Sequence, residues 1–84
     1  MFNNYQLQEI ETGKQHGVDV DIYSTPCYDA KQMWVIRKGL EFNIPILYLN
    51  PIIPWNIMYE IFKLTVFYND IDTLQQKIQN LFIE

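Results

Sequence analysis

The chain has 84 residues, with ten acidic against six basic side chains, a net charge of −4 and a pI near 4.7. This length gives one domain, residues 1–84, and 49% apolar with 19% charged residues is typical of a folded domain rather than a disordered one. The negative charge argues against binding to DNA or RNA phosphates, which needs clustered positive charge.

The single cysteine, Cys27, excludes an intramolecular disulfide and argues against a structural Cys/His zinc site. The first residues lack the pattern of a signal peptide, and the longest apolar stretch, 44–55, contains prolines and is too short to span a bilayer. We therefore expect a cytoplasmic protein with no membrane contact. Aromatic residues make up 15% of the chain, which favours a protein partner or a homodimer.

The first half of the chain begins with an ambiguous segment. Residues 1–17 fit a short helix that ends at Gly13 as well as a strand that turns at 12–14, so we treat them as an N-terminal extension of uncertain structure. Residues 18–23 alternate between apolar and acidic side chains, which predicts a strand with one buried face.

Two further helix–strand pairs are expected after this strand. A helix over 27–38 would end at Gly39, and the apolar run 44–49 predicts a strand buried on both faces. Residues 55–64 fit a second helix and 65–68 a short third strand.

The last expected helix, over 71–82, has the clearest helical spacing of apolar residues. We find no internal repeat in the sequence. The resulting order is strand, helix, strand, helix, strand, helix. Short crossovers of this kind predict parallel, right-handed pairing and an α/β domain.

Residues 20–31, Val-Asp-Ile-Tyr-Ser-Thr-Pro-Cys-Tyr-Asp-Ala-Lys, resemble the opening of glutaredoxins, in which a strand leads to a Cys-x-x-Cys motif on a helix that carries Ala-Lys. Lys-Gly-Leu-Glu-Phe at 38–42, Lys-Leu-Thr-Val at 63–66 and Asp-Thr-Leu at 72–74 are similar to later parts of that family. The resemblance covers residues 18–84. It implies a redoxin-like core with a small thioredoxin-like three-layer fold, β-α-β-α-β-α, and a mixed sheet of three or four strands.

The sequence also departs from the glutaredoxin pattern. Ala30 replaces the second cysteine if Cys27 is the first, which gives a monothiol form. Matching Ala30-Lys31 instead places Ser24 at the position of the nucleophile, and both alignments stay open. The family's cis-proline after Thr-Val is absent because Phe67 follows, and the Gly-Gly before the last helix is missing too.

Cys27 is the candidate catalytic residue, because a thiol at a helix N-terminus ionises more readily. The other interpretation is a small buried apolar residue, as free cysteines usually are. By resemblance alone, Tyr28, Thr65, Val66 and Asp72 would line the groove for glutathione or a protein thiol. No cofactor is expected, and glutathione enters only as a co-substrate of the redox alternative.

The remaining candidates concern charge and partner binding. We interpret His16 as a solvated loop residue, and Asp19 and Asp21 as a solvated strand face, rather than as metal ligands or acid–base groups. An apolar loop and two tryptophans are candidates for partner binding because Trp is favoured in interface hot spots. These candidate partner-binding residues are Trp34, Ile52, Ile53 and Trp55.

Together these features predict a small non-catalytic protein-interaction module on a glutaredoxin-like scaffold, of the kind that a virus or mobile element carries as an accessory or inhibitor protein. The alternative is a monothiol glutaredoxin-like thiol–disulfide oxidoreductase that uses Cys27. The lost second cysteine, the absent cis-proline and the many aromatic residues favour the first. A protein partner or a homodimer is expected, and no nucleic acid or membrane.

Overall fold

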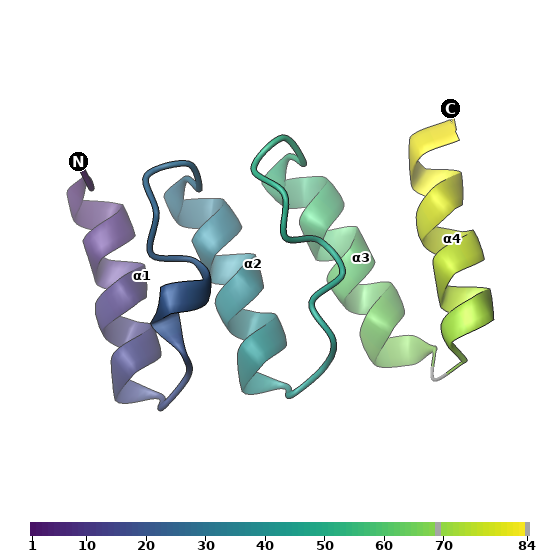
Figure 1. Cartoon of the computed structure of the whole chain (residues 1–84), viewed down its shortest axis with the longest axis horizontal. Helices are drawn as coiled ribbons and strands as arrows, with labels where there is room; N and C mark the ends of the chain where they lie inside the picture. The colour runs from purple at the N-terminus through teal and green to yellow at the C-terminus, as the bar shows by residue number, and fades with distance from the viewer. Residues whose placement is uncertain (69, 84) are drawn as a thin grey trace.

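A computed structural model of the chain describes residues 1–68 and 70–83. Within these residues, a 3₁₀ turn, η1 (Val20–Ile22), lies between the first two of the α-helices. The helices are α1 (Asn4–Gln15), α2 (Ala30–Glu41), α3 (Trp55–Phe67) and α4 (Ile71–Ile83). In Figure 1, α1, α2 and α3 lie side by side and run in the same direction, joined by long loops that return along the helices. α4 runs back alongside α3.

The predicted α/β thioredoxin-like domain is wrong, because the described residues form helices, loops and a 3₁₀ turn without a β-strand. The predicted redoxin-like core over 18–84 requires a central sheet, and the described residues do not form one. Both segments that were expected to be the principal strands, 18–23 and 44–49, are parts of the returning loops. In both loops, alternate side chains pack on the helices.

In the first loop, Val18 and Val20 pack against the helical core whereas Asp19 and Asp21 face solvent. This one-sided packing produces the same alternation as a half-buried strand. The backbone hydrogen bonds are local instead of between strands: the N–H of Tyr23 donates to the carbonyl of Val20 at 3.1 Å. The segment is therefore a 3₁₀ turn that lies on a pair of helices.

The second loop behaves in the same way. Ile44, Ile46 and Tyr48 pack inward, while Leu47 and Leu49 between them are exposed. The run is continuously apolar because its outward side chains are also leucines, and this made it resemble a strand buried on both faces.

The helix boundaries differ from the predictions at several points. α1 contains Gly13 instead of ending there, and α2 begins at Ala30 and continues through Gly39. α3 continues through most of the third predicted strand, 65–68, because helical packing overrides the β-propensity of its residues. The helix predicted over 71–82 is confirmed as α4.

α1 and α2 begin with the same capping box. The side chain of Asn3 accepts from the backbone N–H of Gln6, and the Gln6 side chain accepts from the N–H of Asn3. Asp29 and Gln32, 26 residues further along, do the same. These reciprocal bonds satisfy donors that a helix start leaves free.

The two glutamines also hold the start of the following helix. Gln6 Nε2 donates to the carbonyl of Tyr28 at 2.7 Å, and Gln32 Nε2 donates to that of Ile53 at 2.7 Å. Tyr28 and Ile53 each immediately precede the N-cap residue of the next helix. In α3 the corresponding third residue is Ile57, which cannot make this bond.

The last turn of α1 and of α2 contains a glycine, and a residue with positive φ and a tyrosine follow each helix at matching places. Gly17 and Asn43 adopt positive φ angles of 77° and 59°, which turn the chain back. An added Cβ on Gly13 would collide with the hydroxyl of Tyr23, and one on Gly39 would collide with that of a second tyrosine, Tyr48. Both hydroxyls donate to a backbone carbonyl of the preceding helix.

The chain therefore contains an internal repeat, which the sequence inspection missed. Residues 3–28 form one unit of helix and returning loop, and 29–53 form a second that is one residue shorter in its loop. The tyrosine hydroxyl bonds back over 14 residues in the first unit and 13 in the second. Few side chains are identical between the units. The repeat is therefore easier to recognise from the matching hydrogen bonds than from the amino-acid sequence.

The core lies between the helices and the loops that cover them. Its fully buried side chains come from both units and from α3, and α4 packs on α3 with Leu74 buried. The largest fully buried side chains are Tyr23, Met33, Val35, Ile36, Tyr48, Met58 and Ile61.

Candidate functional site

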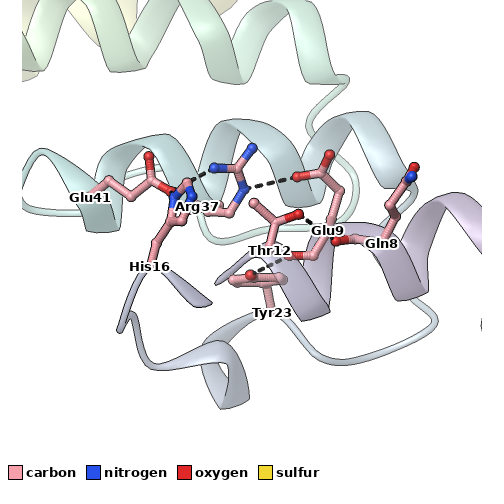
Figure 2. Close-up of polar contacts among 7 residues, drawn as sticks. All are labelled: Gln8, Glu9, Thr12, His16, Tyr23, Arg37 and Glu41. Atoms are coloured by element: carbon pink, nitrogen blue, oxygen red, sulfur yellow. Dashed lines mark hydrogen bonds and ion pairs between the residues drawn. The ribbon is translucent and has the colours of Figure 1, made fainter. Parts of the chain in front are cut away.

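A polar network joins α1, α2 and the first loop (Figure 2). Arg37, which is buried, donates from Nε to Glu9 at 2.9 Å and from Nη1 to Glu41 at 2.6 Å. His16 Nδ1 lies 2.5 Å from the same Glu41 carboxylate. Tyr23 Oη donates to the Glu9 carbonyl at 2.9 Å, so one arginine, two carboxylates, a histidine and a phenol meet here.

The electrostatics of this network are those of a closed structural cluster. Burial would raise the pKa of the Glu41 carboxyl, but hydrogen bonds from His16 and Arg37 outweigh it and hold that pKa below its usual value. Burial raises the pKa of Tyr23 to about 12. Each member is engaged by another, and only Glu9 also reaches a cavity, the groove described below, while its carboxylate is held by Arg37. We therefore assign the network to holding the first two units together.

A metal centre is not supported by the part of the chain that the structure describes. Its His, Cys, Asp and Glu side chains form no group of three or more that could hold an ion. His16, Asp19 and Asp21, which we interpreted from the sequence as solvated residues, are exposed. Among the described helices, none combines the length and the apolar character that crossing a bilayer requires.

An open groove of about 730 Å³ lies across the N-terminal halves of α1 and α2 and the start of α3. Its floor and walls are mostly apolar, and its aromatic residues come from three different helices: Tyr5, Trp34 and Trp55. Its polar lining residues are Asn3, Gln8, Glu9, Asp29 and Lys31. We call this feature the aromatic groove.

Lysines lie over the aromatic rings in and beside this groove. Lys31 Nζ is 5.0 Å from the ring centroid of Trp55. Lys38 Nζ is 5.5 Å from that of Trp34, and this ring lies 5.6 Å from Tyr59. A third pair of this kind is Lys63 with Tyr59.

The capping boxes place the groove residues. Because Asn3 and Asp29 start α1 and α2 at equivalent points, Tyr5 and Lys31 occupy the second helical position of their helices, and Gln8 and Trp34 the fifth. Equivalent positions of parallel neighbouring helices lie side by side, about 10 Å apart. Side chains from successive units therefore form rows across the molecule.

The residues proposed for a glutaredoxin-like site are not brought together. Cys27 is exposed in the turn before α2, which contradicts its interpretation as a buried residue, and Tyr28 beside it is buried. Thr65 lies in the last turns of α3 with its hydroxyl bonded to the Ile61 carbonyl. Because α2 and α3 are parallel, this places it at the other end of the helical layer from Cys27 (Figure 1).

The other two members of that set are exposed: Val66 on α3 and Asp72 in the first turn of α4. Cys27 does not lie at the free N–H groups of a helix start either. Asp29 is the N-cap of α2, and its side chain already accepts from the first turn. The predicted thiol-substrate groove is thus absent from the arrangement of these residues.

The four candidate partner-binding residues divide into two pairs. Trp34 and Trp55 line the aromatic groove together. Ile52 leaves 85% of its surface exposed on the loop before α3, whereas Ile53 is half-buried against the core. Neither isoleucine lines the groove.

Sequence reasoning missed Tyr5 and Lys31 as groove residues. Tyr5 is 72% exposed on α1, in the segment whose structure the sequence left open. The pattern that could have placed both is the spacing of Asn-x-x-Gln at 3–6 and Asp-x-x-Gln at 29–32, a capping-box signature that aligns the two helices.

Comparison with known proteins finds no matching family model, no matching curated protein and no matching solved structure. The candidate site therefore rests on the geometry of this chain alone.

Proposed function

We propose that this chain is a non-catalytic protein-interaction module, and that the aromatic groove binds a segment of a partner protein. The observation that carries the proposal is the convergence of Tyr5, Trp34 and Trp55, from three helices, on one open apolar groove. Aromatic side chains of this kind dominate the energetics of protein interfaces.

The scaffold supports this function. Units of helix and loop that pack only on their neighbours form extended surfaces, and such repeat arrays commonly serve as binding scaffolds. The elements of this chain pack in that sequential way, α1 on α2, α2 on α3 and α3 on α4.

The polar groups of the described residues also favour binding over catalysis. Their buried side-chain nitrogen and oxygen atoms all have hydrogen-bond partners within the chain, so none of these atoms is unpaired and free to bind a substrate. The polar network of Figure 2 is likewise engaged internally. The groove offers a ligand a mostly apolar surface that also includes polar side chains, a combination found in protein interfaces.

Site-specific photocrosslinking tests the proposal directly. A photoreactive phenylalanine analogue placed at Tyr5 should crosslink a discrete partner protein in the cells that make this chain, because this position faces the groove and is exposed. The same analogue at Ile52 is the matched control, since that side chain is equally accessible but lies outside the groove.

The result expected is a crosslinked band at Tyr5 that Trp55→Ala removes and that is absent at Ile52. Equal crosslinking from both positions, or none from Tyr5, would contradict the proposal.

A further inference from the structure

Two lysines at the aromatic groove, Lys31 in its lining and Lys38 beside it, are not in ion pairs among the described residues, although the chain as a whole is acidic. Each ammonium lies over a tryptophan ring instead, at 5.0 Å and 5.5 Å. Such stacking keeps the charge close to the apolar surface where a ligand would lie.

The carboxylates that line the groove, Glu9 and Asp29, and Glu60 of the neighbouring Lys63 pair already make contacts within the chain. Glu60 pairs with Lys63 at 2.8 Å, and Glu9 accepts from the guanidinium of Arg37. Asp29 accepts from the backbone N–H of Gln32 as a helix cap. Lys31 and Lys38 are therefore cations without an ion-pair partner, next to carboxylates that already accept hydrogen bonds within the chain.

Resting on the proposed function, we propose that the occupant of the aromatic groove is an acidic protein segment with apolar anchor side chains. Its apolar residues would pack on Tyr5, Trp34 and Trp55, and its carboxylates would pair with Lys31 and Lys38. Opposite charges placed across an interface select the partner and speed its encounter more than they add affinity.

A nucleic acid fits this site less well, although aromatic rings with lysines can also bind single strands. A phosphate backbone carries a charge at every nucleotide and would pass the carboxylates of Glu9 and Asp29, which line the groove. A protein segment can place its few carboxylates only where the lysines are.

The test uses three fluorescein-labelled peptides that share Trp and Leu positions. Their remaining positions are acidic in the first, Ser and Gln in the second, and Lys in the third, and a labelled oligo-dT is the fourth probe. Fluorescence anisotropy is measured with the full chain at low and high salt. The acidic peptide should bind roughly five-fold or more tightly than any other probe, and salt should weaken it.

Lys31→Gln and Lys38→Gln should each weaken the acidic peptide roughly two- to five-fold. Lys14→Gln, which removes the same charge from the outer side of α1, should leave binding unchanged.

Three results would overturn the inference: equal or tighter binding of the neutral or Lys peptide, tightest binding of oligo-dT, or no binding of any probe. If any of these occurs while the crosslink at Tyr5 persists, the groove binds a protein of different chemistry and the proposed function stands. If the crosslink is also lost, both fail.

Discussion

Two glycines set how closely each tyrosine approaches its helix. Tyr48 Oη donates to the Val35 carbonyl at 3.0 Å, and it reaches that atom by passing over Gly39, which has no Cβ in the way. Gly in a helix ordinarily costs about 1 kcal/mol relative to Ala, so its presence here requires a compensating contact. The tyrosine is that contact.

Gly39→Ala should therefore destabilise the protein by about 1–3 kcal/mol, opposite in sign to the usual effect in a helix. The added methyl group would collide with the Tyr48 hydroxyl and with Ile46. Urea denaturation measures the change. In a Tyr48→Phe background, which by itself loses about 1 kcal/mol, the penalty of the alanine should shrink. A stabilising Gly39→Ala would show that the tyrosine does not lie over this helix.

The buried phenols predict alkaline unfolding. Burial raises the pKa of Tyr23 to about 12, and it raises that of Tyr48 as well. Since the folded pKa lies above the unfolded value near 10, stability is complete below pH 10 and is lost as the pH rises towards 12. Phenolate absorbance and circular dichroism should show these tyrosines ionising together with the loss of helix. Ionisation of all six tyrosines near pH 10 with unchanged helix content would contradict this.

At the scale of the element, the contact between α1 and α2 depends on the shared carboxylate of Glu41. Its folded pKa is lowered, so its contribution is present above its usual pKa and is lost as the pH falls through the lowered value. Glu41→Gln should cost about 1 kcal/mol at neutral pH and should flatten the acid limb of the stability curve. Glu11→Gln, on an exposed position of α1, is the control. A curve unchanged by Glu41→Gln would mean that the network of Figure 2 adds nothing to folding.

The elements also show what the sequence could predict. α4 was found from its period, because its apolar residues lie on one face and its glutamines on the other. Residues 18–23 were misread because period-two alternation reports one-sided burial, and a loop lying on helices buries one side as a strand does. Residues 44–49 were misread because their exposed side chains are apolar too, so the run looked like a strand buried on both faces. The hydrogen bonds that distinguish the two cases do not appear in the hydropathy pattern.

The candidate site was predicted in part. Trp34 and Trp55 were named as partner-binding residues, and the structure places both in one groove. Tyr5 was missed because residues 1–17 were not assigned to a helix. Lys31 was missed because no pattern in the neighbouring sequence marks a lysine as part of a groove. The glutaredoxin resemblance placed Cys27, Thr65 and Asp72 in a site that depended on a sheet, and without the sheet they lie on separate elements.

For the whole molecule, sequential packing predicts graded stability. Each helix packs on its chain neighbours, so loss of one end should not open the other end at once. Leu74→Ala, which removes a buried side chain from α4, should raise amide hydrogen exchange in α3 and α4 more than in α1. Phe82→Ala, at an exposed position of α4, is the control. Uniform loss of protection would indicate one cooperative core instead of stacked units.

The central claim is that two units of helix and returning loop replace a sheet, and nuclear Overhauser contacts test it most directly. The account predicts contacts between the Gly13 α-protons and the Tyr23 ring, and between the Gly39 α-protons and the Tyr48 ring. Cross-strand contacts between residues 18–23 and 44–49, with the glycine–tyrosine contacts absent, would contradict it.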